Sequence, residues 1–590
     1  MNTKKGITLI ALVVTIIVLL ILAAVTITLI LGPDGVIEKA RDTRVSGRYA
    51  NIMDKVYARD ANLAIAFNLG ETGESQEEFI NRLIAERLLF EGEYDKETYR
   101  NIYLGEKKDG TYKYIINIAD GTASGKIIAN MINSLPDAEA PGNEYLKRMS
   151  LKIKTTVSNE VVELPISNTT GLTINWDVAN NPNSFDNPNL TENPTYSYLD
   201  PDEYEVQISG ISQEGTSFGI NMVDYINPNI IGINFWGENG FSAINSMGYY
   251  LQDNIPLPSR NSFVNVLNFE TAFTDWSKIS GEIPALLFAN CPKVTSFNRT
   301  FANCEKLTTI PGNLFLNCPN VLNFRTVFYG CSNLAQIPTG LFDNCTKVTN
   351  FEAIFYDCLN LNNAIPIGFF KNNTKVISFS FAFSGCKKLT AIPAGLFDHC
   401  SNAEDFSVVF QSCENISTIP QGLFKYSTEA TSFRWTFASC TKLTAIPPGL
   451  FDNCPNVTTF NGVFYFCTKL SSPIPAGLFS YCPNVETFEF AFNCCFTLPG
   501  EIPSGLFSNC PKVTSFEYTF VACSNLTNIP IDLFDACPNV TTFHKTFNDC
   551  KGLEGNAPNL WARTNVIDSE ACFQDCINLL NYAEIPDDWK

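Results

Sequence analysis

Cysteine is the residue type with the widest chemical potential in this chain of 590 residues, which contains 21 Cys and only 2 His. A thiol beside a histidine can act as a nucleophile, and a cluster of thiols and imidazoles can bind zinc. His399 precedes Cys400 directly, but adjacent side chains on a repeating coil are expected to point to different sides. No CxxC pair occurs. The sequence therefore predicts no metal site and no catalytic cysteine.

A repeat must position these cysteines. Its unit is approximately IPxGLFxxCPxVTxFxxxFxxCxxLTx, and proline returns every 27 or 28 residues. A fixed period of this length is typical of a solenoid, in which each coil buries its apolar face against its neighbours. Positions within a coil are numbered here from its proline, so that Phe288 occupies position 4 after Pro284. The repeat prolines are Pro256, Pro284, Pro311, Pro338, Pro366, Pro393, Pro420, Pro447, Pro475, Pro503, Pro530, Pro558 and Pro586.

The repeat resembles the BspA-like leucine-rich repeat surface proteins of bacteria, especially the branch with VTxMxxMFxxC units. The segment IIGINFWGENGFSAINSMGYY, Ile230–Tyr250, resembles the start of such arrays. The resemblance implies a leucine-rich-repeat-type solenoid of about 12 coils over residues 226–590, including a leading cap. It also implies display outside the cell and adhesion to host or neighbouring-cell ligands. Phenylalanine replaces much of the usual Leu and Met, so we expect an aromatic core.

Comparison of the coils with one another predicts which positions face inward. Positions 4, 13 and 17 carry Phe in most coils, and position 16 is small or β-branched. Positions 13, 16 and 17 are therefore expected inside the solenoid, and positions 14 and 15 outside it.

Position 15 varies freely and is aromatic in four of ten coils, at Phe381, Trp435, Phe490 and Tyr518. Together with Arg434 at position 14, these residues predict an exposed aromatic stripe that binds an extracellular protein or glycan. The alternative is that the rings only cover neighbouring coils and bind nothing.

The cysteines form two rows, one at position 7 and one in the FxxC element, with Cys494 and Cys572 as additional members. Cysteines of stacked coils are expected to lie within disulfide range by distance alone. However, Asn373 and Ser427 replace Cys in the first row, and the total is odd. These observations favour buried free thiols, while an isolated disulfide such as Cys572 with Cys576 stays an alternative.

The N-terminal region contains an apolar segment, ITLIALVVTIIVLLILAAVTITLIL, at residues 7–31. A helix of this length spans about 37 Å, enough to cross a bilayer, and a secretory signal peptide has a shorter apolar core. Lys4 and Lys5 precede the segment and predict a cytoplasmic N-terminus. We therefore expect a transmembrane helix that anchors the rest of the chain at the cell surface.

The residues KKGITLIAL resemble the leader of type IV prepilins and pseudopilins. In that family a prepilin peptidase cuts after the glycine, and the new N-terminal residue is methylated. The resemblance implies a leader at 1–6, cleavage between Gly6 and Ile7, and pilin-like partners. The family usually carries Glu five residues after the cut, where this chain has Ala11. The absence of that carboxylate disfavours the usual filament packing, because a buried unpaired ammonium is costly.

Two smaller units separate the apolar segment from the repeat. A capped amphipathic stretch at Ser75–Phe90 predicts a helix, and Lys113–Asp120 predicts a strand. These elements indicate a pilin-like α+β head over residues 32–133. A proline-rich acidic linker follows at 134–146.

Residues 147–225 are rich in short alternating segments such as LKIKTTV, LTINWDV and EYEVQISG, which predict a β-sandwich. The segment TYSYLDPDEYEVQISG, Thr195–Gly210, resembles the end of PKD-like Ig-fold domains, and Trp176 with Asp177 fits an earlier part of that family. The glycine that usually follows is replaced by Val178. The resemblance implies a spacer or recognition module on a cell surface.

Composition and motifs exclude several function classes. The chain carries 60 acidic and 40 Lys or Arg residues, a net charge of −20, which disfavours binding to nucleic acid. Neither GxSxG, HExxH nor a Walker loop occurs, so no enzymatic activity and no cofactor are expected.

The sequence thus predicts a multidomain protein with a pilin-like transmembrane helix, a small α+β unit, a PKD/Ig-like β-sandwich and a leucine-rich-repeat-type solenoid. Its predicted function is that of a surface-anchored adhesin or recognition protein. The alternative is a minor pilin or pseudopilin with a structural role in a type IV pilus or type II-like secretion filament.

Overall fold

The structure is a computed structural model. The leader at 1–6, the apolar segment at 7–31 and the linker at 134–146 lie outside the residues that it describes. Within the described residues, no helix is both long and apolar enough to span a membrane. The described residues are 76–85, 89, 93–94, 101–106, 112–117, 148–167, 171–180, 194–210, 217–219, 229–238, 241–245, 258–259, 262–279, 281–362 and 364–590.

The α+β unit contains α3 (Gln76–Ala85), which lies inside the predicted helix and is the only α-helix in the described parts of the chain. Its apolar face is formed by Phe79, Ile80 and Leu83, which are fully buried at helical spacing. A hairpin of β1 (Asn101–Glu106) and β2 (Tyr112–Asn117) follows, paired antiparallel. The strand predicted from Lys113 is therefore confirmed, and its partner β1 was not predicted.

A four-stranded antiparallel sheet forms the β-rich region, in the order β10-β3-β8-β6. The buried apolar side chains of β3, β6 and β8 come from alternating strand residues, as period-2 patterning requires, while the register of β10 shifts twice. The Tyr198 hydroxyl donates a hydrogen bond to the Trp176 carbonyl at 2.6 Å and closes this core. A separate pair is formed by β4 and β7. The strands are β3 (Met149–Lys154), β4 (Glu160–Glu163), β6 (Leu172–Asn175), β7 (Thr195–Tyr198), β8 (Glu203–Gly210) and β10 (Ile230–Phe235).

The β-rich region is continuous with the solenoid. Strand β10 lies beyond the expected domain boundary at residue 225 but pairs with β3. Strand β9 (Ser217–Gly219) pairs with both β5 (Ile166–Ser167) and β11 (Ala243–Asn245), and Ala243 bridges in parallel to Asn268 of the first coil. One hydrophobic core runs through both parts, so the two regions stabilise each other.

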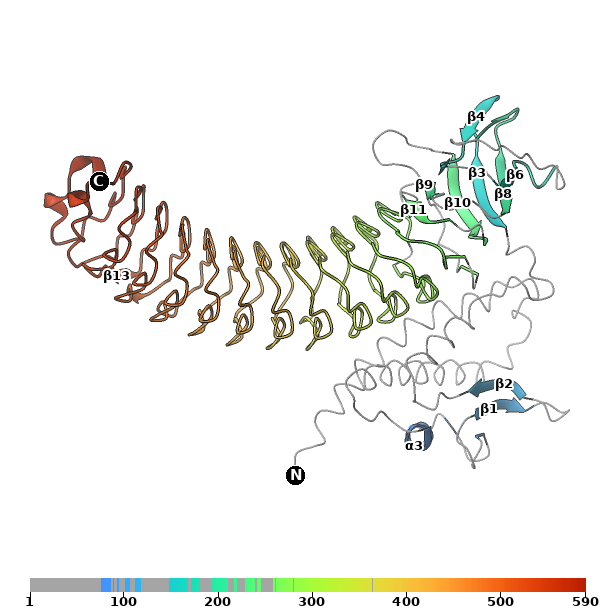
Figure 1. Cartoon of the computed structure of the whole chain (residues 1–590), viewed down its shortest axis with the longest axis horizontal. Helices are drawn as coiled ribbons and strands as arrows, with labels where there is room; N and C mark the ends of the chain where they lie inside the picture. The colour runs from blue at the N-terminus through green and yellow to red at the C-terminus, as the bar shows by residue number, and fades with distance from the viewer. Residues whose placement is uncertain are drawn as a thin grey trace.

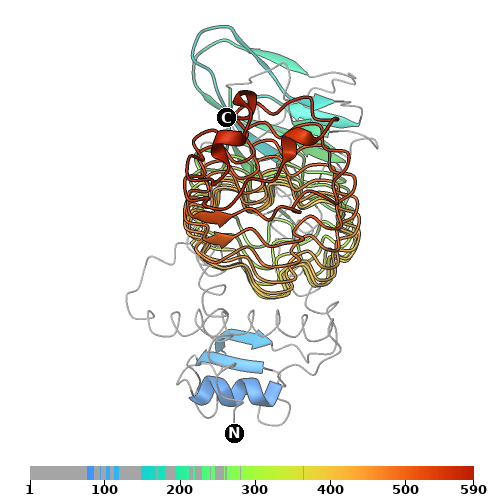
Figure 2. The ribbon, with the colours of Figure 1, turned by 90° about the vertical axis from the view of Figure 1, so that its left-hand side faces the viewer.

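The solenoid coils stack into a curved rod (Figure 1), and their backbones superimpose when the rod is viewed along its length (Figure 2). A backbone ladder joins each coil to the next. The N–H groups of positions 13, 15, 17 and 19 donate to the carbonyls of positions 12, 14, 16 and 18 of the following coil. Examples are Phe297 to Asn323, Arg299 to Arg325, Phe301 to Val327 and Asn303 to Tyr329, with N···O distances of 3.0, 3.0, 2.9 and 2.6 Å.

Three rows of stacked Phe rings fill the coils at positions 4, 13 and 17, and those at 13 and 17 were predicted to face inward. Successive stacked rings are 5.3–5.9 Å apart at position 17, from Phe273–Phe301 to Phe301–Phe328. At position 4 the spacing is wider, between 5.8 Å for Phe397–Phe424 and 6.3 Å for Phe370–Phe397. In a curved stack, the row with the larger spacing between successive rings lies nearer the outer, convex side of the curve. The ladder segment with position 17 therefore lies on the inner side of the curve.

The far end of the rod is closed by three short 3-10 helices, η2 (Leu560–Ala562), η3 (Tyr582–Glu584) and η4 (Asp587–Trp589). Trp589 is 5% exposed and packs against Phe543 and Phe573 of the last coils. Near this end β12 (Gly500–Glu501) pairs in parallel with β13 (Leu526–Asn528).

All 21 cysteines are free in the structure, and all except Cys494 are buried, which confirms the prediction of buried thiols. In the FxxC row each thiol donates to a carbonyl of the preceding coil, as Cys331 Sγ does to the Phe301 oxygen at 3.2 Å. Burial raises the pKa of Cys331 to about 12. Because the thiolate is the reactive form, this row has a structural role. Cys400 is buried and His399 is exposed, so the two side chains point apart.

Candidate recognition surface

Position 15, where the aromatic stripe was predicted, has a left-handed backbone. Its φ angle is +57° at Arg299, +59° at Phe381, +55° at Trp435 and +56° at Tyr518. Among the described coils only Gly462 is a glycine at this position. Non-glycine residues in this conformation are strained, and β-branched ones such as Val408 most of all.

The inter-coil ladder holds this strained position in place. The Trp435 N–H donates to the Asn461 carbonyl at 2.8 Å, and the Trp435 carbonyl accepts from Ala438 N–H at 3.2 Å. The same pair of bonds recurs at position 15 of neighbouring coils. The backbone geometry is thus set by the repeat, while the side chain at position 15 is free to vary.

Trp435 lies flat on the next coil. A Cβ atom added to Gly462 would fall 2.7–3.0 Å from the indole atoms Cδ2, Cε2 and Cε3. The indole therefore occupies the place that a side chain at position 15 of that coil would take. It bridges to Phe490, one coil further, at a ring-centroid distance of 6.1 Å and an interplanar angle of 30°.

Phe490 and Tyr518 continue this run. Their rings are stacked with centroids 4.8 Å apart and an interplanar angle of 5°. Tyr465, at position 18, meets the Trp435 ring at 4.8 Å and 61°, and the Phe490 ring at 6.4 Å and 73°. These contacts define one cluster, the Trp435 group, which consists of Trp435, Tyr465, Phe490 and Tyr518.

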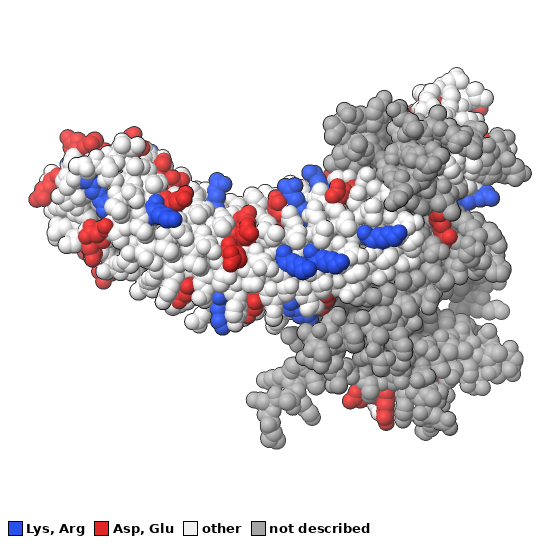
Figure 3. All heavy atoms as spheres, viewed as in Figure 1, with Lys and Arg blue, Asp and Glu red and all other residues white. Residues whose placement is uncertain are grey.

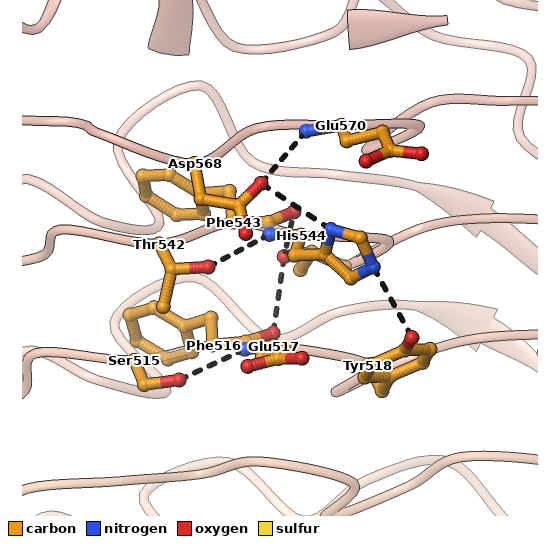
Figure 4. Close-up of polar contacts among 10 residues, drawn as sticks. Ser515, Phe516, Glu517, Tyr518, Thr542, Phe543, His544, Asp568 and Glu570 are labelled. Atoms are coloured by element: carbon orange, nitrogen blue, oxygen red, sulfur yellow. Dashed lines mark hydrogen bonds and ion pairs between the residues drawn. The ribbon is translucent and has the colours of Figure 1, made fainter.

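A polar chain extends from the Trp435 group toward the end of the rod (Figure 4). The Tyr518 hydroxyl lies 3.1 Å from His544 Nε2, and His544 Nδ1 lies 3.3 Å from Asp568 Oδ1. The imidazole is therefore held between a phenol and a carboxylate. The Lys545 ammonium lies 5.5 Å from the Tyr518 ring centroid, a cation–π contact.

Acidic side chains accompany the group at position 14. Burial raises the pKa of Glu517 above its ordinary value, and the neighbouring Glu489 carboxylate raises it further, partly opposed by His544 and Lys545. Glu489 Oε2 accepts a hydrogen bond from Asn461 Nδ2 at 3.0 Å. These carboxylates make an additional anion unfavourable at this place.

A second aromatic cluster lies earlier along the rod. Tyr329 and Tyr356 stack at 5.2 Å, and Phe381 meets Tyr356 at 5.8 Å and 78°. These three residues are named the Phe381 group. Tyr356 and Phe381 have the same position numbers, 18 and 15 of the next coil, as Tyr465 and Phe490.

The predicted stripe is therefore divided. The structure brings Trp435, Phe490 and Tyr518 together, with exposed Arg434 next to Trp435 in the chain, and places Phe381 in the separate group. Tyr465 and His544 were not predicted. Comparison of positions 18 and 14 between coils could have found both, because they lie beside position 15 of the same ladder.

No cluster of three or more His, Cys, Asp or Glu side chains able to hold a metal occurs among the described residues. Basic and acidic side chains are interspersed along the face of the solenoid seen in Figure 3, without a continuous field of one sign. The residues at positions 14, 15 and 18 described above thus offer aromatic rings, hydroxyls and single charges.

Comparison with protein families supports the repeat. A family model described as "Mycoplasma protein of unknown function, DUF285" matches residues 267–397 and 481–584. The match lies within the solenoid and fits a BspA-like repeat protein. The search of the curated proteins found no match.

Among solved structures, "Crystal structure of TLR13-ssRNA13 complex" is similar at 13% sequence identity, over 58% of this chain. The chain spans about half (52%) of the length of that solved chain, with a TM-score of 0.15. At this TM-score the likeness supports no conclusion about fold or ligand.

Proposed function

We propose that this chain is a cell-surface recognition protein, an adhesin, whose solenoid binds a protein or glycan ligand through the Trp435 group. Binding without catalysis fits the chemistry of the group, which contains rings, hydroxyls and single charges. Anchorage is assigned to the apolar segment at 7–31, on the basis of its length and hydropathy.

One observation supports the proposal most. Large aromatic residues occupy position 15 at Trp435, Phe490 and Tyr518, where the left-handed backbone favours glycine. The solenoid does not need rings there for its fold, because Thr326 and Lys545 occupy the same position in other coils.

The test is an adhesion assay with the full chain coated on beads from detergent solution, against a panel of epithelial and bacterial cells. We expect the wild type to adhere and the double variant Trp435→Ala, Phe490→Ala to lose adhesion. The matched control is Tyr356→Ala, Phe381→Ala, which removes two rings of the Phe381 group. Equal adhesion of the Trp435 double variant and the wild type would contradict the proposal.

A second candidate function rests on the residues around Gly6 and Ile7. Their likeness to a prepilin cleavage site favours a minor pilin or pseudopilin that assembles with pilin-like partners. Mass spectrometry of the protein from its native membrane tests it. A chain that begins at methylated Ile7 supports this function, and one that begins at Met1 argues for a plain membrane anchor.

A further inference from the structure

The Trp435 indole differs from the other rings of the Trp435 group in what it lies on. Phe490 and Tyr518 are stacked at 5°, so each covers a face of the other. Trp435 instead lies with one face on Gly462, which has no side chain, and it keeps part of its surface in solvent. We take the side of the indole opposite Gly462 as the one that a ligand can reach.

The Tyr465 ring stands at an angle to the Trp435 indole, and the two rings together form an aromatic corner. Its ring meets the indole at 61° with centroids 4.8 Å apart. A corner of two aromatic rings holds a small, rigid, disc-shaped ligand better than a flexible chain, because it restricts the ligand's orientation at little entropic cost.

The backbone at this place offers nothing to a peptide. The N–H groups of Trp435, Gly462 and Phe490 donate to the next coil, and their carbonyls accept from Ala438, Tyr465 and Asn493 of their own coils. Recognition of an extended peptide by strand addition needs free backbone groups of this kind. Any ligand must therefore be held by side chains.

Polar side chains at position 14 of this coil and the coils that follow suit hydroxyl groups. Asn461 Nδ2 fixes Glu489 Oε2, and Glu489 Oε1 has no hydrogen-bond partner among the described residues. Arg434 is exposed and supplies donors from the other neighbouring position. The carboxylates of Glu489 and Glu517 disfavour an anionic ligand.

We infer that the Trp435 indole on Gly462 is a subsite for an uncharged pyranose ring of a glycan. The C–H face of the sugar packs on the indole, and its hydroxyl groups bond to Glu489 and Arg434. This inference rests on the proposed function and names the ligand class of the same surface.

The experiment uses the full chain in a detergent without a sugar headgroup, because glycoside detergents would compete. The probe is an array of neutral oligosaccharides, including chito-, cello-, manno- and galacto-oligosaccharides, with sialylated and sulfated glycans beside them. We expect binding to at least one neutral glycan and weaker or no binding to the acidic ones. Titration calorimetry with the bound neutral glycan then measures the variants.

Two variants test the indole and its support. Trp435→Ala should weaken glycan binding about tenfold, which corresponds to about 1.4 kcal/mol for the loss of one stacked ring. Gly462→Ala keeps Trp435 but places a methyl group where the ring lies, so it should weaken binding similarly. Gly422→Ala is the matched control, since its φ is also positive and its new Cβ meets only Lys425 at 3.7 Å.

Phe381→Ala provides a second control, because it removes a ring of the other group, and it should leave the affinity unchanged. Binding of no neutral glycan would overturn the inference, and retained cell adhesion would then leave the proposed function standing. An affinity that Trp435→Ala and Gly462→Ala leave unchanged would also overturn it. Urea unfolding of each variant verifies that losses are not due to misfolding.

Discussion

The interior and the inner surface of this solenoid use aromatic rings in opposite ways. Inside, the same residue recurs in coil after coil, and the Phe460 ring packs against rings of both neighbouring coils. At position 15 the backbone recurs but the side chain changes, from Thr326 to Trp435 to Lys545. The repeated rings provide stability, and we propose that the varied ones provide recognition. The predictions below test this division, from the largest expected effect to the smallest.

Truncation inside the solenoid should have the largest effect on stability. Phe460 is fully buried and touches Phe433, Phe451, Phe479 and Phe488. We expect Phe460→Ala to lower the free energy of unfolding by about 3–5 kcal/mol, through lost burial and a cavity. Urea unfolding followed by circular dichroism measures it.

The control for this prediction is Phe381→Ala on the surface. Phe381 is 37% exposed, and its ring contact within the described residues is with Tyr356. Its loss should lower the free energy of unfolding by less than about 1 kcal/mol. Comparable losses for the two variants would contradict the division between interior and surface.

A gain in stability is expected from a substitution that restores the repeat residue at an interior position. Ser427 replaces Cys in the row at position 7, is fully buried, and has no hydrogen-bond partner for its hydroxyl. We expect Ser427→Cys to raise the free energy of unfolding by about 1 kcal/mol, because it removes an unpaired buried polar group. The reverse change, Cys454→Ser in the next coil, should lower it. A loss of stability in Ser427→Cys would show that the row does not require an apolar atom.

The left-handed backbone at position 15 should determine the order of stability among variants at that position. Arg299 is exposed and has a φ of +57°. We expect Arg299→Gly to be at least as stable as the wild type, and Arg299→Val to be less stable by about 1 kcal/mol, since β-branched residues tolerate this conformation least. Melting temperatures of the three proteins test the order. A valine variant as stable as the glycine variant would contradict the assigned conformation.

The smallest effect concerns charge on the surface. The pKa of Glu517 is raised above its ordinary 4.5, mainly by burial. Below pH 4.5 the Glu517 carboxyl group is protonated in both the folded and the unfolded chain. Its favourable contribution to the free energy of unfolding is then fully present. As the pH rises through the higher folded value, the folded chain holds the proton more tightly, so stability falls.

Glu517→Gln should remove this decline, and the free energy of unfolding measured between pH 4 and 7 tests it. The variant should be slightly more stable than the wild type at pH 7 and indistinguishable from it near pH 4. An identical pH profile for the two proteins would contradict the assignment.

The sequence predicted the interior better than the surface, for a physical reason. The inward positions of Phe297 and Phe301 carry Phe in most coils, so comparison of the coils identifies them. The left-handed conformation at position 15 is nearly hidden, because only Gly462 shows the residue type that it favours. The contact of Trp435 with Gly462 depends on the register between coils, which side-chain patterns do not specify.

The junction between the β-rich region and the solenoid could be predicted only in part from residue patterns. Short alternating segments indicated the strands, but the pairing of β10 with β3 joins residues about 80 positions apart. Local patterns do not determine such a pairing. His544 and Asp568, 24 residues apart, likewise meet only because their coils are adjacent.

The most direct measurement of the central claim takes adhesion and urea unfolding from the same sample of the Trp435→Ala, Phe490→Ala double variant. The account predicts that adhesion is lost while the unfolding midpoint moves far less than in Phe460→Ala. Retained adhesion, or a loss of stability as large as that of Phe460→Ala, would contradict it, because the aromatic surface would then serve the fold and not recognition.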